Sequence, residues 1–140
     1  MSGRRIIVHS LAQARAVLAA AHALDVPVTL ASAAGAGGYA GPLWFKSLIE
    51  AARGDFPKVE VSAVLDCGVE AGTTLAALRH GFKRVRFTGA DAALSALRDI
   101  AHQLAAEIEA GDPPEALDLL EEGEPEAAAR AYLAAAKCPA

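Results

Sequence analysis

The sequence predicts an α/β domain in which four strand–helix units follow one another along 140 residues. Two observations favour this class. Short runs rich in β-branched and apolar residues alternate with segments in which apolar residues recur at helical spacing, and each unit takes about 25–30 residues. Consecutive units of this kind form a parallel sheet with right-handed crossovers. Because a complete (β/α)₈ barrel needs about 200 residues or more, we expect either a (βα)₄ half-barrel or an open parallel sheet, with two extra C-terminal helices.

Four segments have the composition of strands, and they cover 4–9, 26–32, 59–66 and 84–88. The third is apolar on both faces from Ala63 to Leu65, which is typical of a central parallel strand.

The fourth strand alternates instead, with Arg84, Arg86 and Thr88 on the face opposite Val85 and Phe87. This pattern has two interpretations. Charged residues on an edge strand discourage pairing with other chains. Alternatively, Arg86 faces the interior of the half-barrel and supplies positive charge for an anionic ligand.

A helix is expected after each strand. The first begins with Ser10-Leu-Ala-Gln13, a capping box in which Ser10 and Gln13 satisfy each other's free backbone donors. Pro42 suits the first position of the second helix, and Asp91 caps a long helix with apolar residues as far as Ile108. The expected helices cover 11–24, 42–53, 70–80, 91–108, 114–122 and 125–137.

The last third of the chain differs in charge from the rest. Residues 107–140 hold nine acids against two bases, Arg130 and Lys137. We therefore divide the chain into a half-barrel domain, residues 1–111, and an acidic C-terminal helical extension of the same domain, residues 112–140. The extension is either a solvated helical face or an acidic arm that docks on a basic part of the body.

A half-barrel leaves sheet edges and one sheet face uncovered, and exposed apolar strand surface is costly. We expect a homodimer in which the C-terminal helices pack on the sheet, in their own subunit or the partner's. Leu117 and Leu120 offer an apolar stripe for this contact. Four acids match the bases Arg84 and Arg86 in sign, namely Glu115, Asp118, Glu121 and Glu122.

Composition indicates where the protein is located and which partners it has. No run approaches the roughly 20 apolar residues of a membrane span, and the basic residues do not cluster with aromatics as they do in nucleic-acid-binding proteins. Cys67 and Cys138 suggest no disulfide framework. We expect a cytoplasmic protein with a small-molecule ligand and without nucleic-acid or membrane partners.

In parallel α/β sheets, ligands bind at the carboxyl ends of the strands. That rule selects five residues as a candidate binding site, namely His9, Ser32, Asp66, Cys67 and Thr88. A carboxylate beside a thiol could transfer protons or bind a metal. The alternatives are that Asp66 accepts hydrogen bonds from loop amides, that Cys67 is a small buried apolar residue, and that His9 closes its strand.

The loop from Gly35 to Ala40 formally matches G-x-G-x-x-A, a dinucleotide-binding fingerprint. The helix after it begins only at Pro42, which is too far to bring its N-terminus against a pyrophosphate. Asp66 follows Gly35 by 31 positions instead of about 20. We interpret the glycines as a mobile loop over the site and predict no nucleotide cofactor.

Two stretches resemble class II fructose-bisphosphate aldolases and their tagatose-bisphosphate relatives. They are AGAGGYAGPLWFKSLIEAA, residues 34–52, and VSAVLDCGVEAGTTLAALRHGFKRVRFTG, residues 61–89. The resemblance implies the fold of the first half of the family's barrel. It implies for Asp66 the position of the catalytic proton carrier, and it places Cys67 where the family has a zinc-binding histidine. A thiolate can bind zinc, but the family's other metal ligands and phosphate-binding loops lie on later strands that this sequence lacks.

These observations lead to three hypotheses. The first is an aldolase-like half-barrel that binds a small anionic metabolite at the strand ends and is not an active aldolase. The second is a lyase or isomerase in which Asp66 carries a proton, assisted by a metal such as zinc at Cys67. The third is a non-catalytic assembly protein. The sequence leaves open whether the protein is an enzyme.

Overall fold

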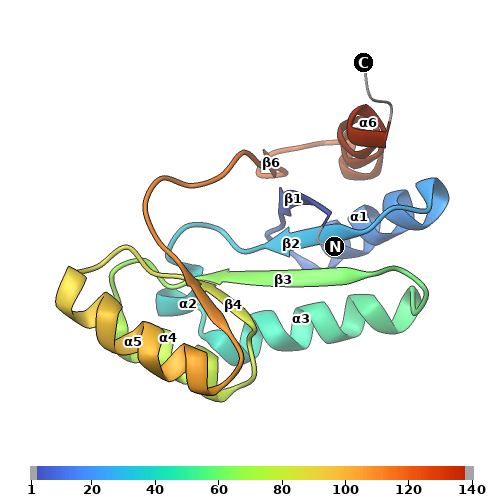
Figure 1. The fold of residues 1–140 in the computed structure, drawn as a ribbon. Helices are drawn as coiled ribbons and strands as arrows, with labels where there is room; N and C mark the ends of the chain where they lie inside the picture. The colour runs from blue at the N-terminus through green and yellow to red at the C-terminus, as the bar shows by residue number, and fades with distance from the viewer. Residues whose placement is uncertain (1–2, 138–140) are drawn as a thin grey trace. The chain divides into compact units, whose positions relative to one another are not determined.

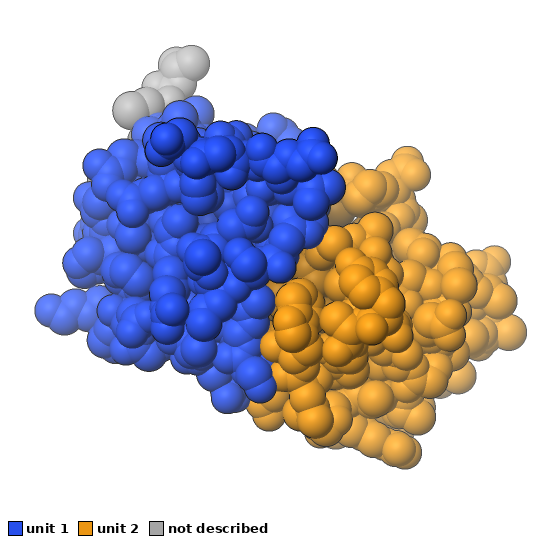
Figure 2. Space-filling model, turned by 180° about the vertical axis from the view of Figure 1, so that it is seen from behind, with its two compact units in different colours: residues 1–31, 47–62, 115–140 blue, residues 32–46, 63–114 orange. Residues whose placement is uncertain are grey.

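The computed structural model describes residues 3–137 (Figure 1). These residues form two compact units that interleave along the chain (Figure 2). Unit 1 comprises Met1–Ala31, Ser47–Ser62 and Glu115–Ala140, and unit 2 comprises Ser32–Lys46 and Ala63–Pro114. The expected division into residues 1–111 and 112–140 stays a prediction, and Cys138 lies outside the described residues.

Unit 1 is built around three parallel strands in the order β2-β1-β6. They are β1 (Arg4–Ile7), β2 (Val28–Ala31) and β6 (Leu117–Asp118). The helices α1 (Leu11–Leu24) and α6 (Pro125–Lys137) belong to this unit, as does most of α3 (Pro42–Asp55). Its core is aliphatic and consists mainly of Ile6, Val8, Val17, Leu18, Val28, Leu30 and Leu133.

The start of α1 follows the predicted capping pattern with one shift. Ser10 Oγ accepts a hydrogen bond from the Gln13 N–H at 3.1 Å. Gln13 does not return the bond to Ser10, because its Oε1 accepts from the His9 N–H at 2.7 Å while its Nε2 donates to the Leu119 carbonyl. The cap therefore ties the helix start to the segment after β6 as well as to β1.

Unit 2 has the same plan, with three parallel strands in the order β3-β4-β5. They are β3 (Val61–Asp66), of which residues 63–66 belong to this unit, β4 (Arg84–Arg86) and β5 (Glu107–Glu109). The unit's helices are the short α2 (Ala36–Tyr39), α4 (Ala71–Arg79) and α5 (Asp91–Gln103). Its buried apolar residues include Leu65, Ala77, Val85, Phe87, Leu97 and Ile108.

The predicted fold class is confirmed. Within each unit the strands pair in parallel with their neighbours, and the arrangement is open, with β6 as the edge strand of unit 1 and β5 as that of unit 2. The four expected strands appear as β1 to β4, each slightly shorter than expected. No helix within residues 3–137 has the length and apolarity needed to cross a membrane.

The expected helix 91–108 is too long. It ends at Gln103, and its N-cap is Ala90 in place of Asp91. Ala105 then takes a left-handed conformation with φ of 55°, which an α-helix cannot continue through. Ile108 becomes the buried centre of β5 and pairs with Val85 of β4. Its spacing fitted the helix, but pairing with a neighbouring strand decides its conformation.

The expected helix 114–122 is wrong. This segment forms β6, because Leu117 and Asp118 pair with Ile6 and Ile7 of β1, and Leu119 N–H donates to the Ile7 carbonyl at 3.1 Å. The expected apolar stripe of Leu117 and Leu120 is therefore wrong too, since Leu119 is the buried residue and Leu120 is 61% exposed.

The expected pairing of C-terminal acids with Arg84 and Arg86 is also wrong. Glu115 lies 3.2 Å from Arg4 Nη2, whereas the partner of Arg84 is Glu107 at 3.4 Å. The homodimer stays a prediction.

The helix α6 packs on α1 and β1 of its own chain. Arg4 fixes it at the surface, because its Nη1 donates to the Tyr132 carbonyl at 2.7 Å and its guanidinium lies 3.7 Å from the centre of the Tyr132 ring. Ala129 and Leu133 fill the buried side of the contact. The C-terminal segment is therefore part of the core of unit 1.

Leu133→Ala should destabilise the protein by about 2–5 kcal/mol, because it removes a side chain that is 2% exposed and leaves a cavity against α1. Urea unfolding followed by circular dichroism measures the change. Leu120→Ala, at a site that is 61% exposed, is the matched control and should change the free energy of unfolding much less. An effect of Leu133→Ala as small as that of Leu120→Ala would show that α6 contributes nothing to the core.

Candidate functional site

Asp66 stands at the carboxyl end of β3 in unit 2 and connects the loops around it. Its Oδ1 accepts hydrogen bonds from the backbone N–H groups of Gly35 at 3.0 Å and Gly68 at 2.8 Å. Its own N–H donates to Ser32 Oγ at 2.9 Å, and that hydroxyl donates to the Ala33 carbonyl. Two residues chosen from the sequence, Ser32 and Asp66, are therefore direct partners.

Arg86 is opposite Asp66 in the β3–β4 register, and its side chain is only 7% exposed. Its Nε lies 3.4 Å from Asp66 Oδ2, its Nη1 3.5 Å from Glu109 Oε1, and its Nη2 donates to the Gly111 carbonyl at 2.5 Å. The Nε–H makes no hydrogen bond to any described residue.

Of the two interpretations of the fourth strand, the edge-strand one is wrong, because β4 lies between β3 and β5. Arg86 is an interior residue. Its single positive charge faces two carboxylates, those of Asp66 and Glu109.

Cys67 follows Asp66 and is fully buried. Burial is the main reason that the pKa of its thiol rises from the ordinary 9.0 to about 11; a hydrogen bond with Thr74 opposes the rise, and the charge of Asp66 adds to it. The backbone at Gly37 passes so close that an added Cβ would lie 2.8 Å from the sulfur. The thiol is therefore protonated at neutral pH and tightly enclosed.

This environment does not fit a zinc ligand. Zinc binds the thiolate and requires about four ligands in total. Within residues 3–137, no group of three or more His, Cys, Asp and Glu side chains could hold a metal ion. Cys67 behaves as the small buried apolar residue that the alternative interpretation expected.

The loop between β3 and α4 directly follows Asp66. Gly68 has a φ of 57°, a conformation that glycine adopts without strain, and its carbonyl accepts a hydrogen bond from the N–H of Thr88 at 2.8 Å. Thr88 is exposed. Beyond the loop, α4 begins after Glu70 without a side-chain cap and without an acid in its first turn.

His9, the remaining predicted site residue, belongs to unit 1. Its Nε2 lies 2.6 Å from Asp118 Oδ1, and the two residues follow or end the neighbouring strands β1 and β6. Burial alone would raise the pKa of Asp118, but the hydrogen bonds from His9 and the Leu120 N–H, together with the charge of His9, lower it. His9 thus forms a separate pair, while the other predicted residues gather in unit 2.

Three partners of the predicted site residues were not expected at the site, namely Glu109, Gly111 and Asp118. All three lie on or after β5 and β6, which were expected to be helical or were not recognised. The two acids, Glu109 and Asp118, each follow an apolar residue, Ile108 or Leu117, and this pattern was the available signal for a short strand.

Searches against known proteins give three results. No family model matches the chain. Two fructose-bisphosphate aldolases of Cereibacter sphaeroides are 35% and 32% identical to it over 82 residues, or 59% of this chain. The fructose-bisphosphate aldolase of Xanthobacter flavus is 34% identical over the same length. The chain is similar to fructose-bisphosphate aldolases. It spans only 22–23% of the length of these relatives.

Solved structures agree with this resemblance at the level of the fold. The YdjI aldolase of Escherichia coli K12 has a TM-score of 0.63 and 19% identity, and the match covers 80% of this chain and 48% of that one. A probable tagatose 6 phosphate kinase of Sinorhizobium meliloti 1021 has a TM-score of 0.61 and 15% identity. This match covers 98% of the present chain and 46% of the kinase chain. The predicted resemblance is confirmed for part of an aldolase-like fold.

The raised pKa of Cys67 gives a pH prediction. A thiol that holds its proton more tightly when folded contributes stability that is fully present below pH 9 and is lost as the pH rises toward 11. A difference of this size corresponds to about 2–3 kcal/mol. The free energy of unfolding of the wild type should therefore fall more steeply between pH 9 and 11 than that of Cys67→Ala. Parallel pH profiles of the two proteins would contradict the burial of a protonated thiol.

Proposed function

We propose that this aldolase-like chain binds a small anionic, hydroxylated metabolite at the carboxyl ends of β3 and β4, and that it has no aldolase activity. The observation that carries the proposal is the arrangement around Asp66. Asp66 Oδ1 accepts the N–H groups of Gly35 and Gly68 and so holds two loops, while Oδ2 faces Arg86. The Asp66 side chain is 17% exposed.

Three groups around Asp66 suit such a ligand. The N–H groups in the first turn of a helix have no intrahelical partner, and those of α4 also lack a side-chain cap, so this end of the helix favours an anion. Asp66 Oδ2 and the exposed Thr88 hydroxyl can hydrogen-bond ligand hydroxyls. The Arg86 Nε lies 3.4 Å from Asp66 Oδ2 and holds this carboxylate in place.

The names of the similar proteins point the same way. Fructose-bisphosphate and tagatose 6 phosphate are small anionic sugars, and the resemblance places Asp66 in the position of the family's catalytic proton carrier. The absence of aldolase activity is proposed because the residue in the zinc-ligand position, Cys67, is enclosed and protonated at neutral pH.

Fructose 1,6-bisphosphate, tagatose 6-phosphate and malate, each tested at millimolar concentration, should include at least one ligand that raises the melting temperature. A ligand present at 100 times its Kd stabilises a protein by about 2.7 kcal/mol. Neutral fructose should give a much smaller shift, because it lacks the anionic group. For each variant, the melting temperature with ligand is compared with the melting temperature of the same variant without ligand.

Asp66→Ala should lose most of the ligand-induced shift, since it removes the hydroxyl acceptor and the anchor of both loops. Asp112→Ala is the control, because Asp112 is an exposed acid of the same unit. The proposal is wrong if no anion stabilises the wild type more than it stabilises Asp66→Ala. Cleavage of fructose 1,6-bisphosphate by the purified protein in the presence of zinc would overturn the proposal that the protein has no aldolase activity.

A further inference from the structure

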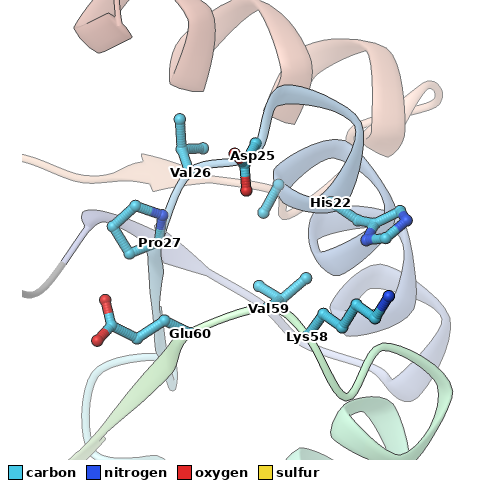
Figure 3. A pocket seen from close by; sticks show the side chains of 8 residues that line it. His22, Asp25, Val26, Pro27, Lys58, Val59 and Glu60 are labelled. Atoms are coloured by element: carbon cyan, nitrogen blue, oxygen red, sulfur yellow. The ribbon is translucent and has the colours of Figure 1, made fainter.

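A second concave site lies in unit 1, at the amino ends of β2 and β3 (Figure 3). It has a volume of about 340 Å³ and lies between the end of α1 and the turn that leads into β3. We call it the α1–β2 hollow. It is lined by Ala21, His22, Asp25, Val26, Pro27, Lys58, Val59 and Glu60.

Backbone hydrogen bonds fix both walls of the hollow. On the α1 side, the Val26 N–H donates to the Ala21 carbonyl at 3.1 Å and the Asp25 N–H donates to the His22 carbonyl at 3.2 Å. On the other side, the Val59 N–H donates to the Phe56 carbonyl at 3.2 Å. Small-molecule sites are usually preformed and hold about 300–1,000 Å³, so this hollow suits a ligand at the small end of that range.

The charged groups of the hollow are separated. In Figure 3 the Lys58 chain and the His22 ring lie on the same side, while the Asp25 carboxylate reaches over the hollow from the end of α1. Asp25 and Lys58 are exposed and form no ion pair with any described residue. Glu60 has an interaction of its own, so we assign it no part in binding.

The backbone of Asp25 gives independent support. This residue caps the C-terminus of α1 in a left-handed conformation with φ of 53°. Helices usually place glycine or asparagine there, because a side chain makes that conformation less favourable. Aspartate adopts this conformation more readily than most residues, and here the conformation places a carboxylate at the rim of the hollow.

We propose that the α1–β2 hollow binds a small zwitterion, an amine-bearing carboxylate of the size of a free amino acid. Lys58 pairs with the ligand carboxylate, to which the His22 ring can add a hydrogen bond. Asp25 pairs with the ligand ammonium. The apolar part of the ligand rests on Val26, Pro27 and Val59. A ligand with a single charge would leave either Asp25 or Lys58 unmatched beside it, so both charges are needed for binding.

The test uses the full chain labelled with ¹⁵N and a panel of the common free L-amino acids at millimolar concentration. At least one of them should give saturable shifts of the amide signals of Asp25, Val26, Lys58 and Val59 in two-dimensional NMR spectra. The N-acetylated and the carboxamide form of that amino acid should each bind about tenfold more weakly, since each loses one charge-assisted contact.

Two variants identify the contacts. Asp25→Asn keeps a residue that tolerates the left-handed conformation, and it should remove the preference for the free amine over the N-acetylated form. Lys58→Met should remove the preference for the carboxylate over the carboxamide. Glu50→Gln, an exposed acid of α3 outside the hollow, is the matched control and should bind like the wild type. Absence of saturable shifts at these amides, or equal binding by Asp25→Asn, Lys58→Met and the wild type, would overturn the proposal.

Discussion

The burial of the Arg86 guanidinium is the constraint on which unit 2 depends. Arg86 is 6% exposed, and a charge removed from water to this extent must be paired and hydrogen-bonded. Its two carboxylate partners are supplied by the neighbouring strands, because Asp66 of β3 and Glu109 of β5 occupy the register positions on either side of it. A shift of one residue in either pairing would move these side chains to the opposite face of the sheet and leave the guanidinium without them. The row of three charged residues, Asp66, Arg86 and Glu109, therefore specifies the register of β3, β4 and β5.

The same contact links the fold to the candidate site. Because Oδ2 of Asp66 faces Arg86, its Oδ1 is available to accept the N–H groups of Gly35 and Gly68. These two glycines belong to the loops that follow β2 and β3. The positions of the α2 loop and of the uncapped start of α4 thus depend on a carboxylate that a buried cation holds in place. Asp66 therefore supports the structure of unit 2 as well as standing at the candidate site.

Local sequence patterns predicted the parts of the fold that are decided locally. The periodicity of α1, the cap at Ser10 and the apolar run of β3 are properties of adjacent residues, and the position of Asp66 at the end of a strand needs no more than the strand itself. The strands β5 and β6 could not be found in this way. Ile108 matches the helical spacing of α5, and only its pairing with Val85 makes it part of a strand. In the same way, β6 exists because Leu117 pairs with Ile6, which is more than one hundred positions away. Glu109 and Asp118 were missed because they lie on these strands, and their partners are distant in sequence.

The central claim is that one buried cation, held by two strand-end carboxylates, organises unit 2. The most direct test compares the free energies of unfolding of Arg86→Met and Arg84→Met in urea. Arg84 is on the same strand, but its side chain is 28% exposed and its partner Glu107 is 68% exposed. Removal of one member of a buried charged group costs about 3–5 kcal/mol, because the remaining charges stay unpaired, whereas an exposed pair contributes about 0–1 kcal/mol. The account predicts a loss in the first range for Arg86→Met and in the second for Arg84→Met. Equal and small losses would contradict it, since Arg86 would then be a replaceable side chain in a core held together by apolar packing alone.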